Sequence, residues 1–133
     1  MSPQPDESQR IDSFEEFWPH YVRAHSSKGS RRLHFIGTSA AMALVAGGVL
    51  TRRLWPVLLA PVVGYGCAWI GHFFVEGNVP ATFGHPLWSL KGDLVMWKKI
   101  LDGTMDAEVE RHRTAAEPGE SPEANVAADP TVN

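Results

Sequence analysis

The sequence predicts an all-α fold, an integral membrane helical hairpin with flanking amphipathic interfacial helices. Residues 33–51 and 54–75 contain no Asp, Glu, Lys or Arg. At about 1.5 Å per residue, each run is near the length that crosses the ~30 Å hydrocarbon core of a bilayer. Only Arg52 and Arg53 interrupt the apolar sequence, which indicates a short turn. The alternative is a soluble all-α domain with two buried helices. Two such runs in 133 residues leave little else to cover them, which favours the membrane.

One folded domain, residues 12–112, is expected between two disordered ends. Residues 1–11 and 113–133 are mostly polar and contain several prolines, and such segments cannot bury enough apolar surface to offset the entropy lost on ordering. The formal charge is −3, and residues 114–133 alone carry four acids without Lys or Arg, so the body is close to neutral. No basic face is interleaved with aromatic residues, so we expect no nucleic-acid partner.

The single cysteine, Cys67, lies inside the second apolar run. A lone cysteine excludes an intramolecular disulfide and a cysteine-based zinc site, and we expect Cys67 to be a small packing residue. The polar N-terminus lacks the apolar core of a cleavable signal peptide. Nucleophile elbows, phosphate-binding glycine loops and dinucleotide fingerprints are also missing from the sequence.

An amphipathic helix is expected to begin after Ser13, a capping residue that is followed by acids in the first turn. Its aromatic side chains recur at helical spacing: Phe14, Phe17, Trp18 and Tyr21. Pro19 falls within this pattern and is expected to kink or reset the helix. The aromatic face either packs in a core or lies at a bilayer interface, where Trp and Tyr favour the headgroup level. We favour the interface.

Residues 87–112 are expected to form one or two further amphipathic helices. Their apolar stripe consists of Leu94, Trp97, Ile100 and Leu101, opposite Lys91, Lys98 and Lys99. This pattern is typical of a helix that lies on a membrane surface. The larger basic cluster flanks the open end of the hairpin, which places both termini on the cytoplasmic side. For a bacterial protein this means the inner, cytoplasmic membrane.

Five polar groups are expected to converge on the open end of the hairpin: His25, His34, His72, Glu76 and His85. His34 opens the first apolar run, whereas His72 and Glu76 close the second and share one helical face at a spacing of four residues. Antiparallel helices bring these positions to the same side, with His25 just upstream and His85 just downstream. Buried polar groups are costly unless they are satisfied, and imidazoles with a carboxylate suit iron, zinc, copper or nickel.

Each of these groups also has an ordinary structural interpretation. His25 could cap a helix, His34 could reach the interface and His85 could belong to a turn. Glu76 is a ligand, an acceptor that orients a histidine N–H, or a structural group that caps a helix or pairs with Arg31 or Arg32. The remaining histidines are interpreted as an interfacial side chain and a solvated one, His20 and His112.

Two sequence blocks resemble the Mpo-type 2-hydroxy fatty acid dioxygenase family. They are Tyr21 with His25-x8-His34 and Gly37, and Gly71-His72-x3-Glu76-x3-Pro80 with Ala81. The similarity covers about residues 14–105, and the second block is the more specific. The chain departs from the pattern between the first two histidines, where Ser26, Ser27 and Ser30 replace the asparagines common in characterised members. It also has fewer apolar runs than the eukaryotic members.

The resemblance implies a small integral membrane protein that uses Fe(II) and O₂ to shorten a long-chain 2-hydroxy fatty acid by one carbon. It implies that His25, His34 and His72 are iron ligands. It adds His85 as a further candidate ligand, and Glu76 as a ligand or as a catalytic group that orients one. Lys28, Arg31 or Arg32 would then hold the substrate carboxylate.

Two other function classes remain open at this point. A non-enzymatic small membrane protein that binds lipid or a partner would use its histidines at the interface. A diiron desaturase or hydroxylase would keep the metal, but such enzymes usually need a larger set of paired histidine clusters. With only two spanning runs, a homodimer would complete the packing of the helices.

Overall fold

A computed structural model describes residues 11–115, in which all regular elements are helical and no strand is present. Five α-helices follow one another along the chain: α1 (Phe14–Arg23), α2 (Lys28–Thr51), α3 (Leu54–Ile70), α4 (Pro86–Leu101) and α5 (Met105–Ala115). A π-helix, η2 (Gly71–Glu76), continues directly from α3, and a 3₁₀ turn, η3 (Ala81–Phe83), precedes α4. The all-α prediction is therefore confirmed for this part of the chain. The segments expected to be disordered, 1–11 and 113–133, lie almost entirely outside the described residues.

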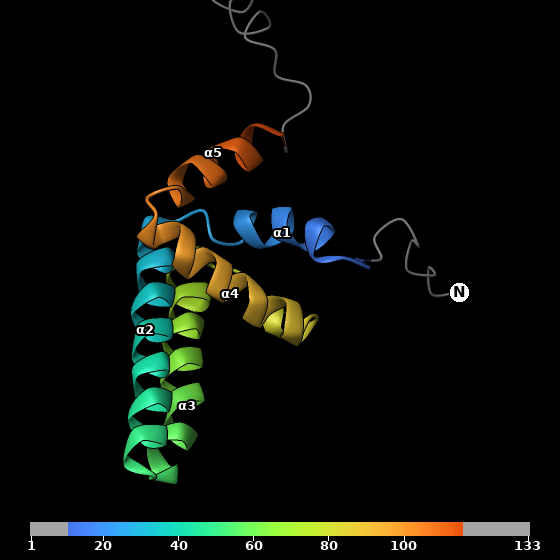
Figure 1. Cartoon of the computed structure of the whole chain (residues 1–133). Coiled ribbons are helices and arrows are strands. Elements are labelled where there is room, and N and C mark those ends of the chain that lie inside the picture. Colours follow the sequence, from blue (N-terminus) through green and yellow to red (C-terminus); the bar gives the residue numbers. More distant parts are fainter. Residues whose placement is uncertain (1–10, 116–133) are drawn as a thin grey trace, which may run out of the picture.

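Helices α2 and α3 run antiparallel and side by side along their whole length, and we call them the α2–α3 pair (Figure 1). Glycines allow their backbones to approach closely. A Cβ atom added to Gly37 would lie 2.7 Å from the Cβ of Cys67, and one added to Gly48 would lie 2.6 Å from Val57. Arg52 ends α2 in the left-handed region, at φ 54°, and so forms the short turn that the sequence predicts.

Both members of the pair are long and apolar enough to cross a membrane, over Lys28–Thr51 and Leu54–Glu76. Most of their large apolar side chains are exposed, with Leu50 at 84% and Phe74 at 84% as the extremes. Two buried core helices of a soluble domain would not show this exposure. The surface of the pair therefore favours the membrane over the soluble alternative.

Helices α1, α4 and α5 gather at the end of the pair where α2 begins and α3 ends (Figure 1). Their core contains Phe17, Tyr21, Val22, Met96, Met105 and Val109. The aromatic face of α1 is thus packed against α4 and α5, so core packing explains this face better than contact with a membrane interface does. Pro19 is accommodated within α1, which runs without interruption from Phe14 to Arg23.

The buried residues of helix α4 lie outside its apolar stripe, whose leucines stay exposed, and this is compatible with the surface-lying helix that the sequence predicts. Its buried residues are Ser89, Gly92 and Met96, whereas Leu94 and Leu101 are 46% and 57% exposed. Gly92 is needed because the ring of Tyr21 occupies the space where its side chain would be, 2.8 Å from an added Cβ. Close packing of α1 on α4, rather than amphipathic periodicity, sets the orientation of this helix.

Candidate metal centre

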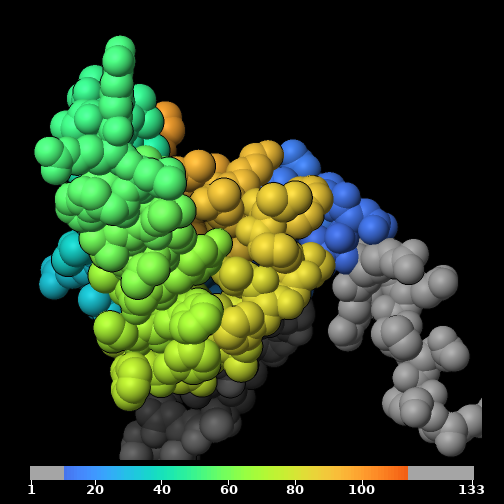
Figure 2. Space-filling model, turned by 90° about the horizontal axis from the view of Figure 1, so that it is seen from below, coloured from blue at the N-terminus to red at the C-terminus, as the bar shows by residue number. Residues whose placement is uncertain are grey.

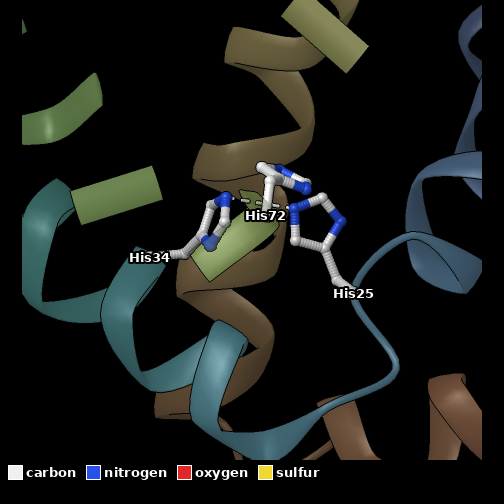
Figure 3. Close-up of side chains that lie close together, drawn as sticks. All are labelled: His25, His34 and His72. Carbon is white, nitrogen blue, oxygen red and sulfur yellow. Dashed lines mark hydrogen bonds between the residues drawn. The ribbon is translucent and has the colours of Figure 1, made fainter. Parts of the chain in front are cut away.

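Three buried histidines face one another at the junction of the α2–α3 pair and α1 (Figure 3). His25 lies in the connection between α1 and α2, His34 lies in α2, and His72 lies in η2. Their exposed fractions are 0%, 3% and 3%. One ring nitrogen from each lies within 4.8 Å of those of the other two, and the ring planes are nearly perpendicular, at 76° to 89°. We call these three residues the histidine trio.

His25 is fixed by the backbone of α1 and by Arg31. Its Nδ1 lies 2.6 Å from the carbonyl oxygen of Tyr21, and the Tyr21 ring stacks on the imidazole with centroids 4.0 Å apart. The buried guanidinium of Arg31 donates to the carbonyl oxygens of His25 and Ser26, at 2.8 and 2.6 Å. Arg31 therefore secures the loop that carries His25.

His34 is held by its own helix, since its Nδ1 lies 2.9 Å from the carbonyl oxygen of Ser30. Gly71 lets η2 approach this part of α2. A Cβ on Gly71 would lie 3.1 Å from Ser30 Oγ and 3.5 Å from the His34 ring. The Ser30 hydroxyl is buried and has no hydrogen-bond partner among the described residues.

His72 lies on the π-helical turn that ends the second long helix. Such turns are rare and often occur at functional sites, because the extra residue changes the direction in which side chains point. The Nδ1 of His72 lies 2.7 Å from Oδ1 of Asn78, and the amide nitrogen of Asn78 donates to the carbonyl of Ala24 at 2.9 Å. That second bond fixes the amide so that its oxygen faces the histidine.

All three Nδ1 atoms therefore meet oxygen acceptors and must carry the proton. In a neutral imidazole the other nitrogen, Nε2, is then an acceptor with a lone pair. Nε2 of His25 lies only 3.1 Å from Nε2 of His34, and two neutral rings in this tautomer present lone pairs to each other. A shared cation resolves this contact. An arrangement in which each Nδ1–H is held by an oxygen and each Nε2 points inward is the one found around metal-bound histidines.

Burial keeps the His25 imidazole neutral. Burial, followed by the neighbouring His34, holds the pKa of the His25 imidazole well below its usual range. Beside it, burial and then Asp93 raise the pKa of Tyr21 well above its usual range. The Tyr21 hydroxyl thus stays protonated and donates to Asp93 Oδ1 at 2.5 Å. Burial also raises the pKa of the Asp93 carboxyl to about 6, although the Tyr21 hydrogen bond acts in the opposite direction.

The structure does not bring Glu76 to the trio. Its carboxylate accepts a bond from the backbone N–H of Ser27 at 2.8 Å and from the Ser26 hydroxyl at 3.3 Å. Ser27 is the N-cap of α2, so the negative charge lies at the positive end of that helix dipole. Of the interpretations that the sequence left open, the capping role fits this position.

The other expected site residues also lie apart from the trio. His85 is the N-cap of α4, and its ring meets Phe17 edge-on with centroids 5.7 Å apart. Lys28, Arg31 and Arg32 line a separate cavity of about 420 Å³, together with Asp106. Arg31 is bonded to Asp106 at 2.8 Å and to the loop carbonyls, so its donors serve the fold.

Sequence reasoning missed the groups that orient the trio. Asn78, Tyr21 and Ser30 act through backbone or amide oxygens, and such contacts leave little trace in the order of residues. The sequence offered one signal for Asn78, because it directly follows Gly77, the glycine that ends the helix of His72, and so stays close to that histidine. Asp93 was also missed, and it lies beside His34 in the wall of one cavity.

Three imidazoles suit several first-row metal ions, including zinc and iron. The residues present fit such an ion because ring nitrogens of three buried imidazoles converge in a site closed to bulk water. No carboxylate joins them within the described residues, so the protein part of the site is all nitrogen.

The chain matches one protein-family model, described as 2-hydroxy-palmitic acid dioxygenase Mpo1-like, over residues 11–105. This range includes the whole trio and Asn78. No curated protein and no solved structure matches the chain.

Proposed function

The chain belongs to the Mpo1-like family, and from that premise we propose that it is an Fe(II)-dependent membrane dioxygenase. Its substrate would be a long-chain 2-hydroxy fatty acid, which it shortens by one carbon. The observation that carries the proposal is the histidine trio, in which one ring nitrogen of each residue lies within 4.8 Å of the other two and each Nδ1 lies against an oxygen. The donor set alone leaves the metal open, and the dioxygenase description of the family supports iron.

His25, His34 and His72 would hold the iron. The bound ion would supply the redox chemistry with O₂ that breaks the bond between the carboxyl carbon and the hydroxyl-bearing carbon. The reaction balances as a 2-hydroxy acid plus O₂ giving the acid one carbon shorter, carbon dioxide and water. The substrate supplies all the electrons that reduce O₂, so no external reductant is needed.

The chain's own residues would orient and shield this centre. Tyr21, Ser30 and Asn78 keep the three Nδ1 atoms protonated through their oxygens, which leaves Nε2 as the ligand atom. Almost complete burial of the trio excludes bulk water, and exclusion of water strengthens each polar interaction in the site. Arg31 would act as a positioning residue, since it secures the loop of His25.

The α2–α3 pair would cross the bilayer and bring the trio near one membrane face. The exposed apolar side chains along both helices support this placement. Basic residues gather at the end of the pair that carries α1, α4 and α5, whereas Arg52 and Arg53 mark the other end. By the positive-inside rule, the first end, with the larger basic cluster, would lie on the cytoplasmic side.

Product analysis tests the proposed reaction. The protein is purified in detergent, loaded anaerobically with Fe(II) and exposed to air with 2-hydroxypalmitate, and the products are identified by mass spectrometry. We expect pentadecanoate from the wild type and none from His72→Ala, with His112→Ala as the control histidine outside the trio. Iron binding without this product would contradict the reaction while leaving the metal centre intact. A product that persists in His72→Ala would contradict the site.

A further inference from the structure

We propose that the groove between α2, α3 and α4 holds the acyl chain of the substrate, with the polar head beside His34, and that Ala46 at its far end limits the chain length. This inference rests on the proposed function. It extends that function by naming the residues that select the substrate. None of the side chains that the sequence suggested for substrate binding lines this groove.

The groove is a cavity of about 500 Å³ that follows the seam of the α2–α3 pair. It lies in the angle where the pair, in green, and α4, in yellow to orange, meet on the face seen in Figure 2. We call the end of the groove nearer the trio its upper end, and it is lined by His34, Asp93 and Ala68. The opposite, lower end lies nearer the turn at Arg52 and is lined by Val45, Ala46 and Pro61. His34 therefore belongs both to the metal centre and to the groove.

The polarity of the lining changes along its length in the way that an amphiphile requires. His34 and Asp93 stand at the upper end, with Thr38 one helical turn below His34. The lower part is lined by apolar side chains alone: Met42, Val45, Ala46, Ala60 and Pro61. A ligand with a polar head at the metal and an apolar tail would match both ends. Burial of the tail is favourable in proportion to its apolar area.

The length of the groove also fits an acyl chain. Ala46 lies twelve residues beyond His34 on α2, which is about 18 Å at about 1.5 Å per residue. A membrane acyl chain spans one leaflet, about 15 Å or half of the ~30 Å hydrocarbon core. A long fatty acid with its head at His34 would therefore end close to Ala46.

Small side chains open the groove. Ala41, Ala46, Ala60, Gly64 and Ala68 contribute to its walls, and an added Cβ on Gly64 would already lie 3.5 Å from Ala41. A large side chain at any of these positions would fill the space of several methylenes. Ala46 is the best place to test this because it is exposed and far from the trio. Ala43 offers a matched control, since it is also exposed on α2 but does not line the groove.

Binding to metal-free protein in detergent tests the inference without turnover. Equilibrium dialysis is done with labelled 2-hydroxypalmitate and with the shorter 2-hydroxydecanoate, for the wild type, Ala46→Phe and Ala43→Phe. We expect Ala46→Phe to weaken 2-hydroxypalmitate binding about tenfold, as expected for two methylenes removed from apolar contact. Binding of 2-hydroxydecanoate should stay within about twofold, and Ala43→Phe should leave both affinities unchanged.

Identical chain-length profiles for Ala46→Phe and Ala43→Phe would overturn the inference. So would a change in oligomeric state of Ala46→Phe without a change in chain preference, because the groove would then hold a second copy. Ala46→Leu, a smaller change with a smaller expected effect in the same direction, replaces Ala46→Phe if that variant does not fold. Length-dependent binding without any product would contradict the proposed reaction but not the groove. Product formation with equal binding of both chain lengths in all variants would contradict the groove but not the proposed reaction.

Discussion

Each histidine of the trio uses one ring nitrogen to hold its position and leaves the other free to bind. The acceptors are two backbone carbonyls, from Tyr21 and Ser30, and the side chain of Asn78. Backbone carbonyls cannot be removed by substitution, so Asn78 is the one support of this kind that mutation can test. Partners of metal-bound histidines typically contribute ten- to a hundredfold in metal affinity.

Asn78→Ala is expected to weaken Fe(II) binding by about ten- to a hundredfold, because His72 loses the oxygen that fixes its tautomer. Glu76→Gln is the contrasting variant. It keeps an oxygen that can cap α2, so metal affinity should stay close to that of the wild type. Anaerobic titration with Fe(II) measures both. Equal losses in the two variants would mean that Glu76 contributes to the metal centre after all.

Asp93 is expected to make stability depend on pH. Its pKa is raised from 3.8 to about 6 in the folded chain, so the folded state holds its proton more tightly than the unfolded state. The contribution of the Asp93 proton to the free energy of unfolding is fully present below about pH 4 and is lost as the pH rises through 6. At about 1.4 kcal/mol per pKa unit, the loss is up to about 3 kcal/mol. Tyr21 and the nearby His34 are the titratable groups that face it.

Asp93→Asn should therefore raise the melting temperature of the metal-free protein at pH 7.5 and leave it nearly unchanged at pH 4. The substituted amide stays neutral at both pH values and still offers an oxygen to Tyr21. Thermal unfolding followed by tryptophan fluorescence provides the measurement, with the exposed Asp102→Asn as control. An equal shift at both pH values would show that the buried charge is not the cause.

At the scale of elements, close contact between helices places the trio. The α2–α3 pair approaches through Gly37, and η2 approaches α2 through Gly71. These contacts set the distance between His34 and His72. Gly47 lies on α2 as well, but an added Cβ there would meet nothing within 4 Å.

Gly37→Ala is expected to destabilise the protein by about 1–3 kcal/mol, since the added methyl overlaps Cys67 and forces the helices apart. Gly47→Ala should be neutral or stabilising by up to about 1 kcal/mol, because alanine favours a helix over glycine. Thermal unfolding in detergent compares the two variants. A similar melting temperature for both would mean that the helices adjust without cost.

Topology made the gathering of the histidines predictable, whereas the details of the site were not. Two apolar runs joined at Arg52 place the start of one beside the end of the other, and this predicts that His34 and His72 lie at the same end. The π-helical turn explains why Glu76 does not join the trio, because a regular helix would leave Glu76 on the same face as His72. Sequence spacing does not reveal such a turn.

The aromatic pattern of α1 could not distinguish a membrane interface from a core. Phe17 and Tyr21 look the same in either case, and only the packing of α4 and α5 over them decides the matter. In the same way, Gly92 rather than the leucines fixes how α4 faces α1, because the Tyr21 ring occupies the space that a side chain at position 92 would fill. Partners distant in sequence determine both features.

At the scale of the whole molecule, the histidine trio and the groups that orient it lie at the end of the long apolar pair where α2 begins and α3 ends. Such a layout would let a lipid-like substrate reach the metal centre from the bilayer without crossing water. It also makes the placement of the two ends of the pair testable, because Arg52 and the exposed Lys98 of α4 mark opposite ends.

Membrane-impermeant maleimide is expected to label Arg52→Cys and Lys98→Cys from opposite sides, each made in a Cys67→Ala background. The comparison uses intact cells and inverted membrane vesicles, with labelling of Lys98→Cys from the cytoplasmic side. Labelling of both positions from one side in sealed membranes would contradict a spanning pair.

Metal stoichiometry tests the central claim most directly. The wild type and single alanine variants of His25, His34, His72, His85 and His112 are loaded anaerobically with Fe(II), passed through gel filtration and analysed for iron. The trio predicts about one iron per chain in the wild type, its loss in each of the three trio variants, and its retention in His85→Ala and His112→Ala. Iron that persists in the three trio variants, or that disappears with His85→Ala, would contradict the assignment of the metal centre.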